Sequence, residues 1–535
     1  MAQNPRIEEG LKRDCCDSAD APRDIENGGE QTVLGLKVQP REESGNHEPT
    51  VQKAATTKTP TLSARALVDM IQAWMYPLSS KTSGQAGAPR LEALDAPRWV
   101  ASIQIVLFHF YYQKWSAFSD TPPHERLAWG GMWTQFFFML SGFILSYAEM
   151  ARPPLPDNKV STLQYVRKRL IVVYPCYLLS ILLIAFASSG QDPFTWAVLP
   201  LHLSLLQAWF PICYHFEDRG YTTCSAWRWN GEAWFISVLM FYWLILRPLA
   251  KVVRKLSLAG ASTLVAACCM LSFGWFAIGQ IPAESHSMRD NVLNIAVKAS
   301  PVGYLHVFVA GIACARVFIL TSMCDAGTGT VVTNETRRVA LDKERIPFLF
   351  RYGCCFGYGL YIVMVTYLGS PLCDDVVSVN PQCLSYLMLH NGGLIPVMGL
   401  VILGAAAGAD PLAEWVFKWR PFLILGQLSY IQYLMQRPVW NFLVTNFPGF
   451  DIRYVYIPTL LAFSFLCQRW AETPYTEWQR TRMKNGEKGF VEVAIEFVDE
   501  KISSTPCRRA SVSIICALIF LVPIVSVTLS SPVAK

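Results

Sequence analysis

The chain has 535 residues, of which 52% are hydrophobic and only 16% are charged, and its formal net charge is +6. Soluble domains carry roughly 25% charged residues, so this composition excludes an ordinary soluble protein and indicates a chain built largely for a membrane. The basic residues form no compact patch with interleaved aromatic residues, which argues against nucleic-acid binding. The 16 cysteines include no CxxC pair and no histidine at zinc spacing, so we predict no metal site.

The N-terminal part of the chain is polar. Residues 1–60 hold too few large apolar side chains to offset the entropy of ordering, so we expect residues 1–95 to be a mostly disordered, cytoplasmic region. Within it we predict an amphipathic helix over 63–76, where Leu67, Ile71 and Trp74 share one face. This helix either lies on the membrane surface or packs weakly on the protein itself.

Ten apolar runs follow, each close to the roughly 20 residues that a helix needs to cross a bilayer. They are 99–118, 130–149, 170–188, 233–250, 258–280, 300–320, 347–368, 386–408, 421–440 and 454–471. A cytoplasmic linker over 477–509 is predicted to join them to an extra transmembrane helix at 510–529. We therefore expect an all-α polytopic membrane protein with ten core transmembrane helices and one appended C-terminal helix.

Basic residues give the expected orientation of these helices. With the N-terminus cytoplasmic and the proline-interrupted segment 194–210 not crossing, almost every basic cluster falls on the cytoplasmic side, as the positive-inside rule requires. The clusters are Arg152, Lys159 and Arg167 to Arg169; Arg247, Lys251, Arg254 and Lys255; Arg337, Arg338, Lys343 and Arg345; and Lys418 with Arg420. We therefore predict a re-entrant or surface segment at 194–210 and one membrane domain over 96–476.

The same orientation places two close cysteine pairs on the non-cytoplasmic side, Cys213 with Cys224 and Cys373 with Cys383. An oxidising lumen or exterior permits disulfides. Each pair is therefore a candidate disulfide, with free thiols as the equal alternative.

The first span carries two ionisable residues on one helix face. Arg98 and His109 are eleven residues apart, which is three turns plus about 20° and about 16 Å along the axis. His109 would lie near mid-membrane, where an ionisable side chain is a functional candidate and desolvation favours a neutral imidazole that can act as a general base. The spacing suits a coenzyme A thioester with its phosphates near Arg98. In the alternative interpretation, Arg98 is only a positive-inside anchor and His109 is a hydrogen-bonded histidine of the core.

This pair resembles the Arg-x10-His signature of the membrane-bound acyltransferase-3 family, which includes bacterial polysaccharide O-acetyltransferases. Other blocks follow in the family's order over residues 94–475, and the ordered set is more specific than any one block. The block at Phe137–Phe143 resembles FFxLSGF, and Arg167–Arg169 with Tyr174 and Pro175 resembles the basic entry of the third span. Asn230, Trp234, Ile236 and Ser237 resemble NxxxWxLS, and Phe308–Gly311 resembles FxxG. The block at Leu425–Pro438 resembles LGxxSYxxYLxHxP, and Glu472–Pro474 resembles ExP.

Several positions depart from the family's pattern. Val172 stands where a second arginine is common, Leu239 where a glutamate is common, and Gln436 replaces a histidine. A shifted register restores a carboxylate at Glu232. These losses indicate either a divergent branch of the family or a catalytically inactive one.

The resemblance implies an enzyme that moves an acyl group, with acetyl among the candidates, from acyl-CoA to a hydroxyl of a sugar, lipid or other natural product. Acyl-CoA would be a co-substrate and no cofactor would be bound. Besides membrane lipids, the partners would be the donor and an acceptor small molecule or glycan. Carried over by position, His109 is the catalytic base, and Arg98 and Arg169 bind or orient the donor.

Three further residues are candidates for polar support of this site: Tyr430, Gln436 and Glu232. For the first two, hydrogen bonds between helices are an equally good interpretation. Three other histidines match no motif and receive no role: His202, His306 and His390.

Two other classes of function stay open. A transporter or flippase also needs buried polar residues, and it predicts inverted repeats with broken helices at matching places. A non-catalytic membrane scaffold descended from the enzyme would account for the departures at Leu239, Val172 and Gln436.

Overall fold

The computed structural model describes residues 89–112, 126–151, 162–187, 192–210, 212–216, 221–279, 298–325, 339–368, 388–447 and 451–484. The predicted amphipathic helix at 63–76, the appended helix at 510–529 and the Cys373–Cys383 pair lie outside these residues. Within them the chain is mostly helical, with two short antiparallel hairpins that the sequence analysis did not predict.

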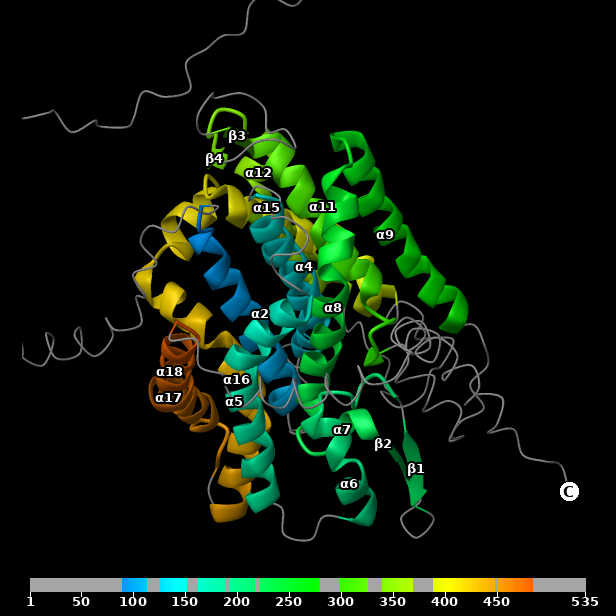
Figure 1. The fold of residues 1–535 in the computed structure, drawn as a ribbon, viewed down its shortest axis with the longest axis vertical. Coiled ribbons are helices and arrows are strands. Elements are labelled where there is room, and N and C mark those ends of the chain that lie inside the picture. The colour runs from blue at the N-terminus through cyan, green and yellow to red at the C-terminus, as the bar shows by residue number, and fades with distance from the viewer. Residues whose placement is uncertain are drawn as a thin grey trace, which may run out of the picture. The chain divides into compact units, whose positions relative to one another are not determined.

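Helices overlap all ten of the apolar runs (Figure 1). They are α2 (Asp95–Leu107), α4 (Thr134–Met150), α5 (Thr162–Ala187), α8 (Trp234–Arg254), α9 (Leu258–Gly279), α11 (Leu305–Ser322), α13 (Gly353–Tyr367), α15 (Ile395–Ala407), α16 (Arg420–Asn446) and α17 (Tyr456–Cys467). Three stretches of the described chain are long and apolar enough on their own to cross a membrane, namely Thr162–Phe186, Gly231–Arg254 and Leu305–Ser322. Shorter apolar helices accompany them, as expected for a multi-pass membrane protein.

Short elements extend or connect these helices. The 3-10 and π segments are η2 (Glu92–Leu94), η3 (Phe108–Tyr112), η5 (Ala128–Trp133), η6 (Ser225–Trp227), η7 (Gly231–Ala233), η9 (Leu389–Gly393), η10 (Ala413–Phe417) and η11 (Gln468–Glu472). The short α-helices are α6 (Pro193–Ala197), α7 (Leu199–Leu203) and α12 (Phe348–Arg351), and α18 (Thr473–Lys484) follows η11 directly. The hairpins are β1 (Cys213–Phe216) with β2 (Tyr221–Cys224), and β3 (Met323–Asp325) with β4 (Val339–Leu341).

The structure corrects one predicted boundary and refines another. Residues 92–95 were expected in the disordered region, but η2 and the start of α2 are ordered there, because Ala93 and Leu94 are buried in the core. At the other end, α18 continues the helix through residues 477–484, which the sequence analysis assigned to a linker. In the segment 194–210, α6 and α7 have five residues each, too few to cross a bilayer.

The glycines of two motif blocks let α4 and α11 touch backbone to backbone. A Cβ on Gly142 would collide with the carbonyl oxygen of Phe308, and a Cβ on Gly311 would collide with that of Met139. Small residues at such a crossing are typical of helix pairs in membranes, where close van der Waals contact drives association. The motif blocks FFxLSGF and FxxG therefore meet in space as a packing device.

We predict that Gly311→Ala lowers the apparent Tm of the purified protein by several degrees, because the added methyl group overpacks this contact at a cost of about 1–3 kcal/mol. Thermal unfolding in detergent, followed by size-exclusion chromatography, measures the effect. The matched control is Gly359→Ala, since a Cβ at Gly359 meets no described heavy atom within 4 Å. Equal stability of the two variants would contradict the packing role.

Candidate functional site

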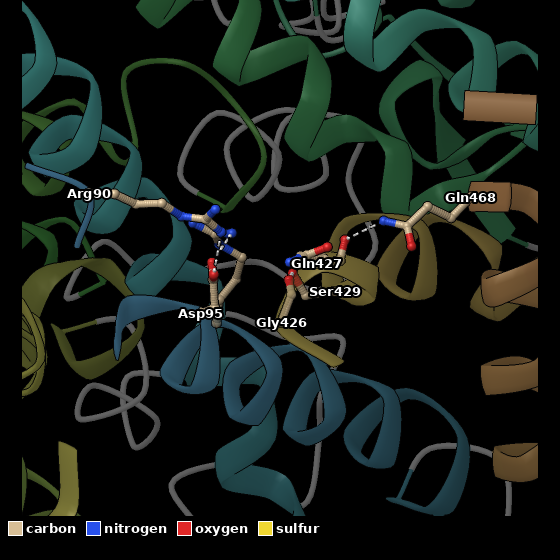
Figure 2. A network of polar contacts seen from close by, with 7 residues as sticks. Arg90, Asp95, Gly426, Gln427, Ser429 and Gln468 are labelled. Carbon is tan, nitrogen blue, oxygen red and sulfur yellow. Dashed lines mark hydrogen bonds and ion pairs between the residues drawn. The ribbon is translucent and has the colours of Figure 1, made fainter. Parts of the chain in front are cut away.

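The N-terminal end of α2 carries a charged cluster. Asp95, in the first turn, is buried and pairs with Nη1 of Arg98 at 2.9 Å and with Nη2 of Arg90 at 3.3 Å; Figure 2 shows Arg90 reaching this carboxylate. A carboxylate in the first turn also interacts favourably with the helix dipole. Two guanidinium groups against one carboxylate leave a net positive charge. The Arg98 side chain stays 29% exposed, so it is open to an anionic ligand.

The C-terminal ends of α4 and α8 meet at this same end of the bundle. Tyr147 of α4 donates its hydroxyl hydrogen to the carbonyl oxygen of Pro89, just before α2, at 3.1 Å. Two residues further on, Glu149 pairs with Arg247 of α8 at 3.2 Å. We call this region, around Arg98, Glu149 and Arg247, the basic end.

Arg169 of α5 also lies at the basic end. Its guanidinium group lies over the ring of Tyr165 at 5.3 Å. Tyr165 is in turn close enough to Glu149 and Arg247 to interact electrostatically with both. The structure thus brings Arg98 and Arg169 to one end of the bundle, on different helices. In the described part of the chain no hydrogen bond or ion pair joins them directly.

His109 lies where α2 passes into the π-helical turn η3. Such turns are rare and often occur at functional sites, where the extra residue re-aims side chains. The imidazole is half-buried, and its centroid lies 5.2 Å from that of Phe108. Phe108 packs so tightly on η5 that a Cβ on Gly130 would clash with it. Packing against η5 therefore holds the turn that carries the histidine.

Helices α2 and α16 pack side by side along most of α2. Three contacts join them in chain order. Asp95 packs against Gly426, where a Cβ on the glycine would collide with the aspartate carbonyl oxygen, and Ser102 Oγ donates to the Ser429 carbonyl oxygen at 3.0 Å. Further along, the ring centroid of Phe110 lies 4.9 Å from that of Trp440. Because residue numbers rise together in both helices, the two run parallel. Figure 2 shows Asp95 of α2 together with Gly426 and Ser429 of α16.

This register predicts what lies at the level of the histidine. Seven residues return a helix to nearly the same face, with a drift of about 20°. Ser102 and His109 are one heptad apart on α2, and Ser429 and Gln436 are one heptad apart on α16, so the spacing predicts Gln436 at about the level of His109. Because the π turn re-aims the histidine side chain, the spacing predicts the level of the two residues and not a contact between them.

Two glutamines on this part of α16 have side chains without hydrogen bonds. Gln432 and Gln436 are both 0% exposed, and no described residue bonds either amide nitrogen or oxygen. Residues four apart are neighbours on a helix face, so the two side chains project from adjacent positions of α16. An unsatisfied buried polar group costs about 1–3 kcal/mol, so four such atoms at one place favour a site for a polar ligand. The sequence analysis missed Gln432, although its spacing from Gln436 could have drawn attention to it.

The other two residues expected to support the site have structural partners. Tyr430 donates its hydroxyl hydrogen to the carbonyl oxygen of Val173 on α5 at 2.7 Å. Glu232 is 5% exposed and lies 3.7 Å from the guanidinium group of Arg437, and its carbonyl oxygen accepts from the Tyr433 hydroxyl at 2.9 Å. Both residues thus hold α16 against its neighbours.

A lobe formed by α6, α7 and the first hairpin lies beside the start of α8. Cys213 and Cys224, one of the two candidate pairs, are joined by a disulfide across β1 and β2. Asp192 caps α6, and although burial raises its pKa, its bonds to Thr195 and the charge of Arg228 outweigh this and lower it overall. These links tie the lobe together without placing a charge on the α2–α16 contact.

Comparison with known families and proteins gives one match. A family model described as an acyltransferase domain matches residues 91–467, which include α2, α16 and every motif block except the last. No curated protein and no solved structure matches the chain.

We predict opposite effects on stability for two buried amides. Gln436→Leu should leave the apparent Tm unchanged or raise it slightly, because it removes two unsatisfied polar atoms. Asn230→Leu should lower it by several degrees, because Nδ2 of Asn230 donates to Ser180 Oγ at 3.0 Å and to the Leu434 carbonyl at 2.9 Å. Thermal unfolding of both purified variants tests this. A large loss of stability in Gln436→Leu would mean that its amide has a structural partner.

Proposed function

The chain belongs to the acyltransferase-3 family and is an acyltransferase, and on that premise we propose that it transfers an acyl group from acyl-CoA to a hydroxyl group within the membrane domain. The observation that carries the proposal is the packing of α2, which bears Arg98 and His109, along α16, which bears two buried amides without hydrogen bonds. Acetyl-CoA is the simplest donor of this class. The acceptor is a sugar, lipid or other natural product that bears a hydroxyl group.

The proposed orientation puts the basic end at the cytoplasmic surface, with the N-terminus on the same side. The positive-inside rule supports this, because Arg169 and Arg247 at this end belong to the predicted cytoplasmic clusters. Arg98 and Arg169 then attract the phosphates of the donor, which acyl-CoA presents from the cytoplasm. The pantetheine arm, lying along α2, brings the thioester toward His109.

Acyl transfer at His109 follows from this placement. The neutral imidazole takes the proton of the acceptor hydroxyl while the oxygen attacks the thioester carbonyl carbon. The C–S bond then breaks, the new ester leaves with the acceptor, and the imidazolium returns its proton to the coenzyme A thiolate. No proton is gained or lost overall, so a single base serves both halves of the reaction.

The amides of Gln432 and Gln436 suit the charge that develops in this reaction. Attack on the thioester turns its carbonyl oxygen into an oxyanion, which fixed N–H donors in a water-poor site stabilise strongly. Each glutamine has two amide hydrogens that no described residue accepts. We therefore assign Gln436, at the level of His109, to the thioester carbonyl, with Gln432 beside it.

We predict that His109→Ala reduces acyl transfer at least about a hundredfold, as expected for loss of a general base. The measurement is label transfer from radiolabelled acetyl-CoA in membranes that hold equal amounts of native or variant protein. Ser464→Ala is the control, since it removes a buried, unbonded hydroxyl on α17 and should act like the native protein. Equal label transfer by His109→Ala and Ser464→Ala would remove the histidine from the mechanism. Movement of a labelled lipid without ester formation would instead favour a flippase.

We predict that Arg98→Ala raises the KM for acetyl-CoA about tenfold and changes kcat little, because the lost interaction is with donor phosphates. Native KM should also rise with salt, since salt screens an exposed charge. Acetyl-pantetheine, which has the thioester but no phosphates, is the control substrate. If Arg98→Ala impaired acetyl-pantetheine and acetyl-CoA equally, the arginine would have a structural role instead.

A further inference from the structure

A second polar cluster lies where several helices of the bundle begin, at the end opposite the basic end. Its centre is η9, a π turn that is sharply kinked: Asn391 has φ −109° and ψ 50°, and Gly392 has φ +112°. Kinked backbone of this kind is tolerated at membrane depth only where protein buries it or where it lines a polar cavity. The sequence analysis assigned no role to any residue here.

Two histidines are held on either side of this kink. Nδ1 of His390 lies 2.7 Å from the hydroxyl of Tyr304, at the start of α11. Nε2 of His306 lies 2.6 Å from the Asn391 carbonyl oxygen, and since a carbonyl only accepts, Nε2 carries the hydrogen. The Asn391 amide in turn donates to the Gly303 carbonyl at 3.2 Å. These bonds fix both rings around Gly392.

Two polar groups at the cluster have no described hydrogen-bond partner. Gln135, at the start of α4, donates through Nε2 to the Leu389 carbonyl at 2.6 Å, which leaves Oε1 as an unbonded acceptor. The hydroxyl of Ser272 on α9 is also unbonded. Both residues are 1% exposed, and a Cβ on Gly392 would run into both Ser272 Oγ and His306 Nε2. Glycine at this position therefore lets the backbone of the kink pack directly against the serine hydroxyl and the His306 ring.

The cluster is close to the proposed catalytic histidine. Two of the π turns, η3 with His109 and η9 with His390, contact the same short helix, η5. A chain of aromatic rings also runs from α16 to Tyr304: Tyr433 to Phe235 at 5.6 Å, Phe235 to Phe138 at 4.5 Å, and Phe138 to Tyr304 at 4.7 Å. The cluster and the turn that carries His109 thus share η5 as a common neighbour.

The chemistry of the cluster matches a neutral hydroxyl better than an ion. The unbonded groups are one acceptor, Gln135 Oε1, and one hydroxyl, Ser272 Oγ, and a single alcohol donates to the first and accepts from the second. Lys298 is the charged residue that acts electrostatically on His390, and no aspartate or glutamate takes part in the cluster's described hydrogen bonds.

We propose that this cluster, formed by Gln135, Ser272, Tyr304, His306 and His390, is a binding site for a hydroxyl-rich acceptor such as a sugar. The proposal rests on the proposed function and names the acceptor side of it. The donor enters at the basic end and the acceptor at the opposite end, so their reacting groups meet near His109. The acceptor hydroxyls that do not react bind at the cluster.

The test uses the full-length protein in phosphatidylcholine nanodiscs and tritiated n-butyl β-glucoside, a sugar with a short apolar tail that does not form micelles. Saturable binding is expected for the native protein. Ser272→Ala should weaken binding about two- to tenfold, the loss expected for one hydrogen bond. The matched control is Ser146→Ala, since Ser146 is another fully buried serine with an unbonded hydroxyl, outside the cluster, and it should bind like the native protein.

Three outcomes would overturn the site. They are no glucoside binding above empty nanodiscs, equal glucoside binding by Ser272→Ala and Ser146→Ala, or stronger binding of the anion butanoate than of the neutral glucoside. A purely structural role for Ser272 would change thermal stability and leave the binding constant unaltered, so Tm is measured on the same samples.

Binding and transfer are measured separately so that the two proposals can fail independently. His109→Ala should bind the glucoside normally while losing label transfer from acetyl-CoA. Normal glucoside binding without any transfer by the native protein would contradict the proposed function and leave the sugar site intact. Acyl transfer without glucoside binding would contradict the sugar site and leave the proposed function intact.

Discussion

The close parallel packing of α2 on α16 is the constraint on which the rest of the site depends. At Gly426 the two backbones touch, and the bond between Ser102 and Ser429 fixes the register one heptad before His109. Any sliding of one helix past the other would change the level of the histidine relative to Gln436. The Asp95 ion pairs hold the start of α2 beside the same glycine, so the packing of α2 on α16 positions both the arginine and the histidine of the signature.

Two π turns give the bundle a polar interior without exposing backbone to lipid. A regular helix satisfies its own backbone groups, whereas a π turn or kink leaves some of them for other partners. At η9 these partners are side chains: Gln135 bonds the Leu389 carbonyl and His306 bonds the Asn391 carbonyl. The helix η5, with Gly130 against Phe108, packs between the two turns. The described polar contacts of these two turns therefore lie in the centre of the bundle and at the end opposite the basic end.

The sequence predicts the parts of this structure that depend on local pattern. Apolar runs of sufficient length become helices at all ten places, and the resemblance carried by the ordered motif blocks is confirmed by the family match. The hairpins could not be predicted, because strands of three or four residues have no periodicity to detect. The cluster at His390 could not be predicted either, since its members come from α4, α9, α11 and η9. Only tertiary packing reveals that Gln135 and Ser272 are buried without full hydrogen bonding.

The unsatisfied amides also bear on whether the departures from the family pattern reflect lost catalysis. Leu239 is buried in the core and Val172 is exposed, so these two positions now serve packing and the outer surface of the bundle. Gln436 is different, because an apolar side chain of similar size there would avoid the cost of burying an unbonded amide. A scaffold gains nothing from two such glutamines in a close helix contact. An enzyme gains from them, because glutamine supplies N–H donors that do not titrate, so that in the proposed mechanism His109 is the group that exchanges protons.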